Sequence, residues 1–377
     1  MNINLHNHYH LKQLFKRELF EIYFLLTLRY LSTYMVGIFI PLYLFVELSY
    51  TLNSVIYFYL AWLIFFTIFL FPGIKATAKF GSKHTMLFSL PFFMLSTAAI
   101  LILPDYPILF FPIAILKGME MGFFWTGFHI DAALHGRKKD LGKQSALISF
   151  MTVLPGIIGP IAGGLIIQLW GFIPLFIITL ALGSIAFIPL FTSKETFAKT
   201  DYILSEFFNK EHLKYFLAYF AQGIGHVTGT IFWPILIFTI LGSYLTLGAY
   251  GTFASIFVGI FGLIFGELSD KGWKNKLIKI SAVFRAIFWT LKAFVQSTLQ
   301  VFGIGTLSGL ASLGITIPLL AKTYKRARKE KVAGFVLFRE LSIRAGQITV
   351  LLTVLAVGDL RIAFIITAIS SVFFFLF

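Results

Sequence analysis

Two opposite charges, Lys117 and Glu120, lie three residues apart in PIAILKGMEMGFFWTG, an otherwise apolar stretch from residue 112 to 127. On a helix this spacing lets the two side chains meet. A desolvated lysine can lose its proton, which an arginine effectively cannot, and a carboxylate in an apolar cavity can take one up. The pair is therefore a candidate site for a proton or a charged substrate, with a structural ion pair of constant charge as the alternative.

Further polar side chains that could bind a proton or a substrate occur in other apolar stretches. The seventh such stretch contains AQGIGHVTGTIFWP, and its histidine is the side-chain type with an ordinary pKa closest to neutrality. For this histidine, helix packing is an equally open interpretation. Besides Lys117 and Glu120, the candidate cavity residues are Arg29, Tyr34, Trp125, Gln222, His226 and Trp233.

Charged residues in two later stretches are expected to have packing roles. Glu340 and Arg344 are four residues apart and next to Arg339, which predicts a buried ion pair between helices. Arg285 and Lys292 share one helix face, and Lys292 is close enough to a helix end for its ammonium to reach water. An unpaired ion at the bilayer centre costs roughly 2.5–3.5 kcal/mol on insertion scales, so each of these groups needs a partner or a route to water.

The composition indicates that the solvent around these residues is a membrane. Apolar residues make up 58% of the 377 residues and charged residues only 12%, too few to cover a soluble surface. The net charge of +15 comes mostly from short loops, which argues against nucleic acid as a partner. No cysteine is present, so disulfides and cysteine-bound metals are excluded. The chain is predicted to be an integral membrane protein without a cofactor or metal.

About 20 apolar residues cross the hydrocarbon core as one helix. By this length the sequence predicts twelve transmembrane helices. They are expected near residues 22–47, 53–73, 84–103, 106–132, 144–169, 172–192, 213–241, 245–267, 277–297, 299–320, 333–356 and 360–377.

Most basic residues fall in alternate loops, six of them between residues 322 and 331. Basic loops favour the cytosolic side. Both termini are therefore predicted to be cytosolic, in a multi-pass protein of the cell (inner) membrane. The first residues lack a small-residue cleavage site after a short apolar core, so they are expected to form an uncleaved cytosolic lead-in.

The longest polar stretch, SKETFAKTDYILSEFFNKEHLK at 193–214, divides the chain into halves that resemble each other. GIFIPLYLF (37–45) and TIFWPILIF (230–238) share Ile, Phe, Pro and Phe at matching positions. Parallel six-helix repeats build one class of secondary transporter. The predicted domains are a lead-in at 1–21, six-helix bundles at 22–192 and 213–377, and a cytosolic linker at 193–212.

Two polar loops resemble the loop motif of the major facilitator superfamily, roughly G-x-x-x-D-R/K-x-G-R/K-R/K. The second copy, GELSDKGWKNK, supplies Gly266, Asp270, Lys271 and Lys274. The first copy, IKATAKFGSK, keeps Lys79, Gly81 and Lys83 but has Ala78 where the motif has its acid. The resemblance implies that these loops latch one side of the protein closed. Asp131, at the end of the fourth predicted helix, is then the expected partner of Lys79 and the only carboxylate left at this junction.

A third stretch, LPGIIGPIAGGLI (154–166), resembles the family motif G-x-x-x-G-P-x-x-G-G, which is associated with exporters of the drug-antiporter type. Its matching residues are Gly156, Gly159, Pro160, Gly163 and Gly164. Independently of the family, small residues and proline let membrane helices approach closely and bend. Helix packing alone is therefore the competing interpretation of this motif.

The resemblance implies an all-α fold of two pseudo-symmetric six-helix bundles, in which the fourth helix lines a central cavity. In the family a basic residue, usually arginine, begins the motif of that helix, and Lys117 is similar to it. The implied function is a secondary active transporter that works by alternating access, with proton-coupled efflux of a small molecule as the leading hypothesis. Import of a small metabolite, for which Lys117 and Arg29 would favour an anion, is the alternative.

Two other classes of protein compete with a transporter. A membrane-embedded lipid-modifying enzyme usually has larger outer loops than this chain, and its histidines are scattered. A receptor or scaffold without transport is compatible with the altered first loop motif. No phosphate-binding loop motif occurs, so an ion gradient is the expected energy source. The expected partners are membrane lipid, a small-molecule substrate and H+, with the monomer as the functional unit and no enzymatic activity.

Overall fold

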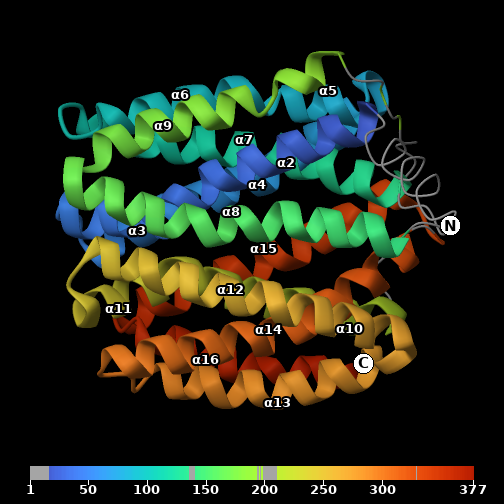
Figure 1. The fold of residues 1–377 in the computed structure, drawn as a ribbon. Helices are drawn as coiled ribbons and strands as arrows, with labels where there is room; N and C mark the ends of the chain where they lie inside the picture. The colour runs from blue at the N-terminus through green and yellow to red at the C-terminus, as the bar shows by residue number, and fades with distance from the viewer. Residues whose placement is uncertain (1–16, 136–140, 193–194, 196, 198–209, 328) are drawn as a thin grey trace, which may run out of the picture.

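The computed structural model describes residues 17–135, 141–192, 195, 197, 210–327 and 329–377. Within these residues the regular secondary structure is helical and includes no strand. The long helices run side by side, and the chain colours separate into an upper group of early helices and a lower group of late ones (Figure 1). The all-α membrane fold predicted from the sequence is confirmed.

In the first group, α7 packs against α4, α5 and α6, while α2 packs against α8 and α9. Its elements are α2 (Arg17–Val36), α3 (Ile40–Leu42), the π-helix η1 (Tyr43–Glu47), α4 (Leu52–Phe80), α5 (Ser82–Leu87), α6 (Ser89–Leu101), η2 (Pro107–Leu109), α7 (Phe110–His135), α8 (Leu141–Trp170), α9 (Phe172–Ile185) and η3 (Ile188–Thr192).

In the second group, α10 packs against α15, and α13 packs against α14 and α16. Its elements are α10 (Lys210–Val227), the π-helix η5 (Thr228–Phe232), α11 (Trp233–Leu241), α12 (Tyr244–Leu268), the π-helix η6 (Ser269–Trp273), α13 (Lys274–Lys292), α14 (Thr298–Ala327), α15 (Val332–Val357), α16 (Arg361–Ser370) and η7 (Ser371–Leu376). The two groups meet mainly where α8 packs on α12 and where α4 packs on α15.

Ten helices among the described residues are long and apolar enough to cross a membrane. One of them, Tyr244–Lys292, contains two predicted spans, since Gly272 with its φ of 94° interrupts the helical backbone between α12 and α13. The last predicted span corresponds to a shorter apolar stretch, Arg361–Leu376. The count of twelve and the cytosolic placement of the termini stay predictions.

The predicted division into domains stays a prediction as well. The linker expected at 193–212 lies largely outside the described residues, and α10 already begins at Lys210 within it. The lead-in expected at 1–21 is described only from residue 17 onward.

The matching sequence motifs of the two halves have prolines in matching places. Pro41 and Pro234 each lie in the first turn of a short helix, α3 and α11. A turn at residues 37–39 precedes α3, whereas the π-helix η5 runs directly into α11. Both departures from regular α-helix lie where proline lacks a backbone N–H. Helices α3 and α11 also contact each other. The duplication of the two halves stays a prediction.

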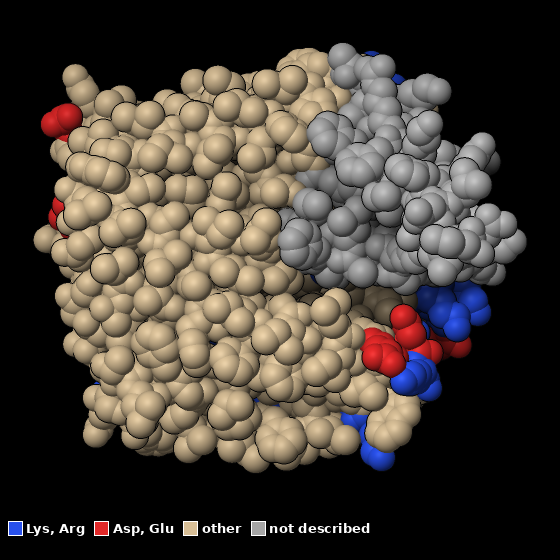
Figure 2. All heavy atoms as spheres, in the orientation of Figure 1, with Lys and Arg blue, Asp and Glu red and all other residues tan. Residues whose placement is uncertain are grey.

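The surface carries an apolar belt. On the face shown in Figure 2, the described charged side chains gather toward the two ends of the molecule, and the broad middle is formed by other residues. Large apolar side chains such as Ile68, Leu95 and Ile260 are about half exposed. This distribution is the one expected where hydrocarbon replaces water around the middle of the helices.

Candidate functional site

The candidate site is built around Glu120, which binds two cations. Lys117 Nζ, on the same helix α7, donates to Glu120 Oε2 at 3.2 Å. Arg29 Nη2, on α2, donates to Glu120 Oε1. The i,i+3 contact follows from the helical spacing, whereas the sequence did not indicate that Arg29 joins it.

The three charged groups lie in an apolar environment. Glu120 is 1% exposed and Arg29 is 7% exposed. The Arg29 guanidinium lies over the ring of Phe124, with 3.7 Å from Cζ to the ring centroid. Lys117 Nζ lies 4.9 Å from the centroid of Phe93. Desolvated cation–π contacts of this kind contribute about 2 kcal/mol each. With all three groups ionised, the cluster keeps one positive charge that Glu120 does not balance.

A second charged cluster lies near the middle of α15. Glu340 accepts hydrogen bonds from Arg339 and from Arg344 Nη2, the latter at 3.2 Å. The Arg344 guanidinium lies over Phe66 of α4, with 4.0 Å from Cζ to the ring centroid. This ion pair therefore reaches across from the second helix group to the first.

His129, on α7, joins the two helix groups at this cluster. Arg339 donates to His129 Nε2 at 3.2 Å, which assigns the ring hydrogen to Nδ1 and makes it the donor to the Tyr324 hydroxyl, also at 3.2 Å. His129 Nε2 is 3.6 Å from Glu340 Oε1. The ring of Trp125 stacks on His129 with centroids 5.3 Å apart. Sequence reasoning missed His129, although a histidine inside a predicted span is itself a signal of function.

Two buried polar atoms on α15 have no hydrogen-bond partner among the described residues. They are Arg344 Nε, a donor, and Gln347 Oε1, an acceptor, and their residues are one helical turn apart. The amide nitrogen of Gln347 donates to His226 Nδ1 of α10 at 2.9 Å, and His226 is itself exposed. A buried polar atom is costly unless it finds a partner. These atoms are therefore available to a polar ligand.

The remaining cavity candidates are dispersed. Tyr34 is 38% exposed and lies beside α8, where a Cβ at Gly156 would be 3.7 Å from its ring. Gln222 Nε2 lies 3.4 Å from Thr316 Oγ1 of α14, inside the second group. Trp233 is buried and donates through Nε1 to the hydroxyl of Tyr250 at 2.9 Å. Trp233 thus packs in the core and does not join Glu120.

Lys292 differs from the sequence prediction, because it does not reach water. Its side chain is 3% exposed, with Nζ 4.2 Å from the ring centroid of Trp233 and 4.0 Å from that of Trp289. Arg285 is equally buried and donates to the carbonyl oxygens of Ala221 and Thr367. Aromatic faces and backbone oxygens take the place of water around these two cations.

The turn between α4 and α5 is contacted by a carboxylate that the sequence did not indicate, Glu195, which follows η3 in the chain. Glu195 accepts from the backbone amides of Lys83 at 3.2 Å and His84 at 3.0 Å. Free amides at a helix N-terminus stabilise a carboxylate. A Cβ at Gly81, whose φ is 88°, would overlap Glu195. The expectation that Asp131 is the only carboxylate at this junction is therefore wrong.

The predicted contact between Asp131 and Lys79 is replaced by other contacts in the structure. Asp131 accepts from Ser82 Oγ at 3.1 Å, while the exposed Lys79 extends over the ring of Phe80. In the second loop, Lys271 pairs with Glu267 at 2.6 Å. The other motif residues of that loop, Gly266, Asp270 and Lys274, flank the bend at Gly272.

The glycines of α8 lie where helices approach closely. A Cβ at Gly163 would overlap the carbonyl oxygen of Met35 in α2, and one at Gly159 would be 2.7 Å from Tyr34 Cβ. A Cβ at Gly164 would be 2.5 Å from the carbonyl oxygen of Tyr244 in α12. On the facing helix, a Cβ at Gly248 would overlap the carbonyl oxygen of Pro160. The motif thus lets α8 pack against helices of both groups.

Gly163→Val is expected to destabilise the protein by about 1–3 kcal/mol, because the new side chain meets backbone that cannot move aside. The measurement is the midpoint of thermal unfolding in detergent. The control is Gly309→Ala on α14, where a Cβ meets nothing within 4 Å, and it is expected to leave the midpoint unchanged or slightly higher. Equal midpoints for the two variants would contradict the packing role of Gly163.

The described residues therefore offer charged and polar groups from both helix groups, but no cluster of three or more His, Asp or Glu that could hold a metal ion. Residues 22–207, 186 of the 377, match the family model of the Major Facilitator Superfamily. Together with the long apolar helices, this match supports a multi-pass membrane transporter.

Solved structures of transporters share the fold of this chain. The fucose:proton symporter FucP of E. coli superposes with a TM-score of 0.67 at 14% sequence identity, over 94% of this chain and 96% of FucP. The human organic anion transporter MFSD10 (TETRAN) superposes with a TM-score of 0.68 at 13% identity, over 96% of this chain and 98% of MFSD10. The similarity in fold therefore extends over both halves of the chain.

A relative in sequence is the uncharacterized protein YqgE of Bacillus subtilis (strain 168). The two proteins are 26% identical over 266 residues, which is 65% of this chain and 60% of YqgE. The chain thus matches less than two thirds of the length of this relative.

Proposed function

We propose that this transporter moves small organic anions by alternating access and couples their movement to protons. The observation that carries the proposal is the buried cluster in which Glu120 holds both Arg29 and Lys117. Two cations around one carboxylate leave a positive charge for which a substrate anion is the natural partner. The unpartnered polar atoms of Arg344 and Gln347 supply further contacts from the other helix group.

Anion binding is coupled to proton binding because Lys117 exchanges its partner Glu120 for the substrate. In the structure, both oxygens of Glu120 are engaged by cations. A substrate carboxylate or phosphate that binds Lys117 competes with Glu120 for this cation. Glu120, left with fewer cations in an apolar environment, then takes up a proton. Binding of anion and proton are thereby linked, and each favours the other.

Alternating access requires the contact between α4 and α15 to open. The Arg344 contact with Phe66 and the Arg339 contact with His129 both cross from one helix group to the other. Rocking of one bundle against the other would break both. FucP and MFSD10, which share this fold, are named as a proton symporter and an organic anion transporter. Because anion and proton favour each other's binding, this coupling is that of a symporter and favours import of an anionic metabolite along an inward proton gradient. The α8 motif favours export, which is the second candidate and requires anion and proton to compete for the site.

Exchange of labelled compounds in proteoliposomes tests the proposal. Small organic anions are expected to exchange, whereas neutral and cationic analogues of similar size are not. Lys117→Met is expected to reduce anion exchange by roughly tenfold or more, since a charge-assisted hydrogen bond contributes about 1.5–3 kcal/mol. The control is Lys276→Met, which removes an exposed cation from α13.

A preference for cations, or unchanged anion exchange in Lys117→Met, would contradict the proposal. Imposing a proton gradient of either sign on the same vesicles separates export from import. In antiport, the anion moves opposite to the protons and accumulates on the side from which the protons come, which corresponds to export. In symport, the anion moves with the protons and accumulates on the side that they enter, which corresponds to import.

A further inference from the structure

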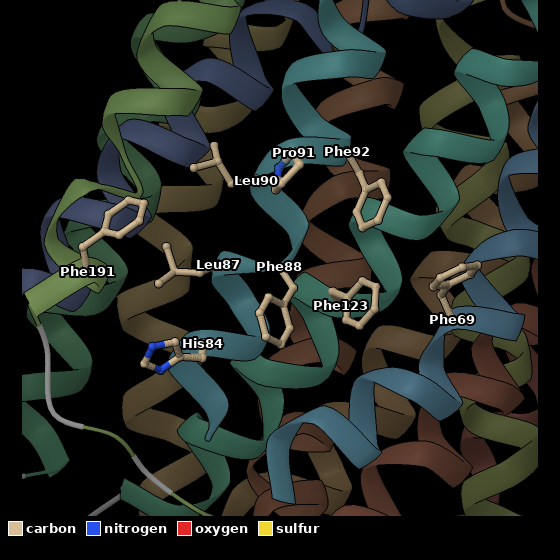
Figure 3. Close-up of a pocket in the computed structure, with 9 residues that line it drawn as sticks. All are labelled: Phe69, His84, Leu87, Phe88, Leu90, Pro91, Phe92, Phe123 and Phe191. Carbon is tan, nitrogen blue, oxygen red and sulfur yellow. The ribbon is translucent and has the colours of Figure 1, made fainter. Parts of the chain in front are cut away.

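A hollow on the surface of the first helix group is lined by apolar rings and side chains (Figure 3). Its volume is about 660 Å³. The lining residues are Phe69, His84, Leu87, Phe88, Leu90, Pro91, Phe92, Phe123 and Phe191. They come from α4, α5, α6, α7 and η3, all in the first group, so the hollow is separate from the contact between the two groups.

The hollow forms where a helix is broken. α5 ends at Leu87 and α6 begins at Ser89, with Phe88 between them and Pro91 in the first turn of α6. Proline removes a backbone donor and disfavours a continuous helix through this point. The ring of Phe123 lines the hollow and stacks on Phe92 with centroids 5.9 Å apart.

A second hollow of about 320 Å³ continues the first, because Phe88 and Phe123 line both. Its lining adds Lys75 and Lys79, which are one turn apart on α4 and exposed. On the other side of the joined hollows, His84 Nδ1 contacts the carboxylate of Glu195 at 2.5 Å. The His84 ring there already faces a carboxylate, so the positive end is the one with the two lysines.

We propose that the joined hollows bind one anionic phospholipid, with an acyl chain against Phe92 and Phe123 and the phosphate between Lys75 and Lys79. The surroundings of an outward-facing apolar hollow in a membrane protein are lipid chains. Basic residues at the end of a transmembrane helix attract anionic headgroups. A zwitterionic lipid brings its own cation to the two lysines and binds less well. This proposal does not depend on which substrate is transported.

Native mass spectrometry of the full chain with equal amounts of phosphatidylglycerol and phosphatidylcholine tests the proposal. The protein is expected to retain one phosphatidylglycerol in preference to phosphatidylcholine. Lys75→Gln/Lys79→Gln is expected to weaken phosphatidylglycerol binding roughly tenfold or more and to leave phosphatidylcholine binding unchanged. Leu87→Trp, which fills the first hollow and leaves both lysines in place, is expected to weaken phosphatidylglycerol binding as well.

The matched control is Lys276→Gln/Lys279→Gln, which removes two exposed lysines from α13 and is expected to retain the phosphatidylglycerol. Equal retention of the two lipids by the unmodified protein would overturn the proposal. A loss in the control as large as in Lys75→Gln/Lys79→Gln, or full binding in Leu87→Trp, would overturn it too. The midpoint of thermal unfolding verifies that each variant is folded.

Discussion

Glu120→Gln is expected to reduce proton-driven accumulation of substrate to background while exchange of labelled substrate stays measurable. The amide keeps the shape of the side chain and can still accept a hydrogen bond, but it cannot take up and release a proton. Exchange needs substrate binding and alternating access only, and Arg29 and Lys117 remain as cations for the substrate. The two assays are accumulation under an imposed pH gradient and counterflow without one, in the same proteoliposomes.

The same substitution is expected to lower stability, since it leaves two buried cations without a carboxylate. Removing one partner of a buried ion pair typically costs about 3–5 kcal/mol. Arg29 retains its contact with the ring of Phe124, which reduces the loss. Glu120→Gln/Lys117→Met removes one of the two cations and is expected to recover part of the stability without recovering proton-driven accumulation.

The control for both assays is Asp105→Asn, which neutralises an exposed carboxylate between α6 and η2, outside the loops of the family motif. Exposed charges contribute little to stability, so transport and thermal midpoint are expected to match the unmodified protein. Proton-driven accumulation at the normal rate in folded Glu120→Gln would refute the coupling role of Glu120 and leave it as a structural partner of Arg29.

Local sequence spacing was sufficient for some parts of the site. The contacts of Glu120 with Lys117 and of Glu340 with Arg344 follow from three- and four-residue spacings, because a helix places such residues on neighbouring faces. The transmembrane helices follow from apolar length in the same way. What these features share is that each depends on a single segment of the chain.

Contacts between segments could not be predicted in this way. Arg29 and Glu120 are separated by 91 residues, and His129 and Arg339 by 210. Whether such residues meet depends on which helices are neighbours and how each is rotated about its axis. The predicted environment of Lys292 is wrong for the same reason. Its distance from the helix end is short enough for the ammonium to reach water, but the rotation of α13 about its axis turns the side chain toward two tryptophans.

Glu340→Gln is expected to open the contact between α4 and α15 more often. Glu340 is 2% exposed, and it binds Arg339 and Arg344, which lie against His129 and Phe66 of the first group. Without the carboxylate, two arginines of like charge remain in one buried place. Separation of the helix groups admits water to them, so the substitution favours the open state.

The absence of cysteine from the chain makes this opening measurable with single reporters. Leu70 of α4 is 1% exposed and belongs to an apolar cluster with Ala333 and Leu337 of α15. Leu70→Cys is therefore expected to react with a water-soluble maleimide about tenfold faster or more when combined with Glu340→Gln. Leu175→Cys, buried within the first group and outside that cluster, is the control reporter and is expected to stay unreactive.

The two reporters separate opening from unfolding. Faster modification at Leu70→Cys alone means that the bundles part at this contact, because unfolding of the first group would expose Leu175→Cys as well. Equal rates of modification at Leu70→Cys with and without Glu340→Gln would mean that apolar packing keeps α4 and α15 together without a contribution from the charged cluster of α15. In that case the α15 cluster would serve substrate binding through Arg344 and Gln347, and closure would depend on the apolar residues around Leu70.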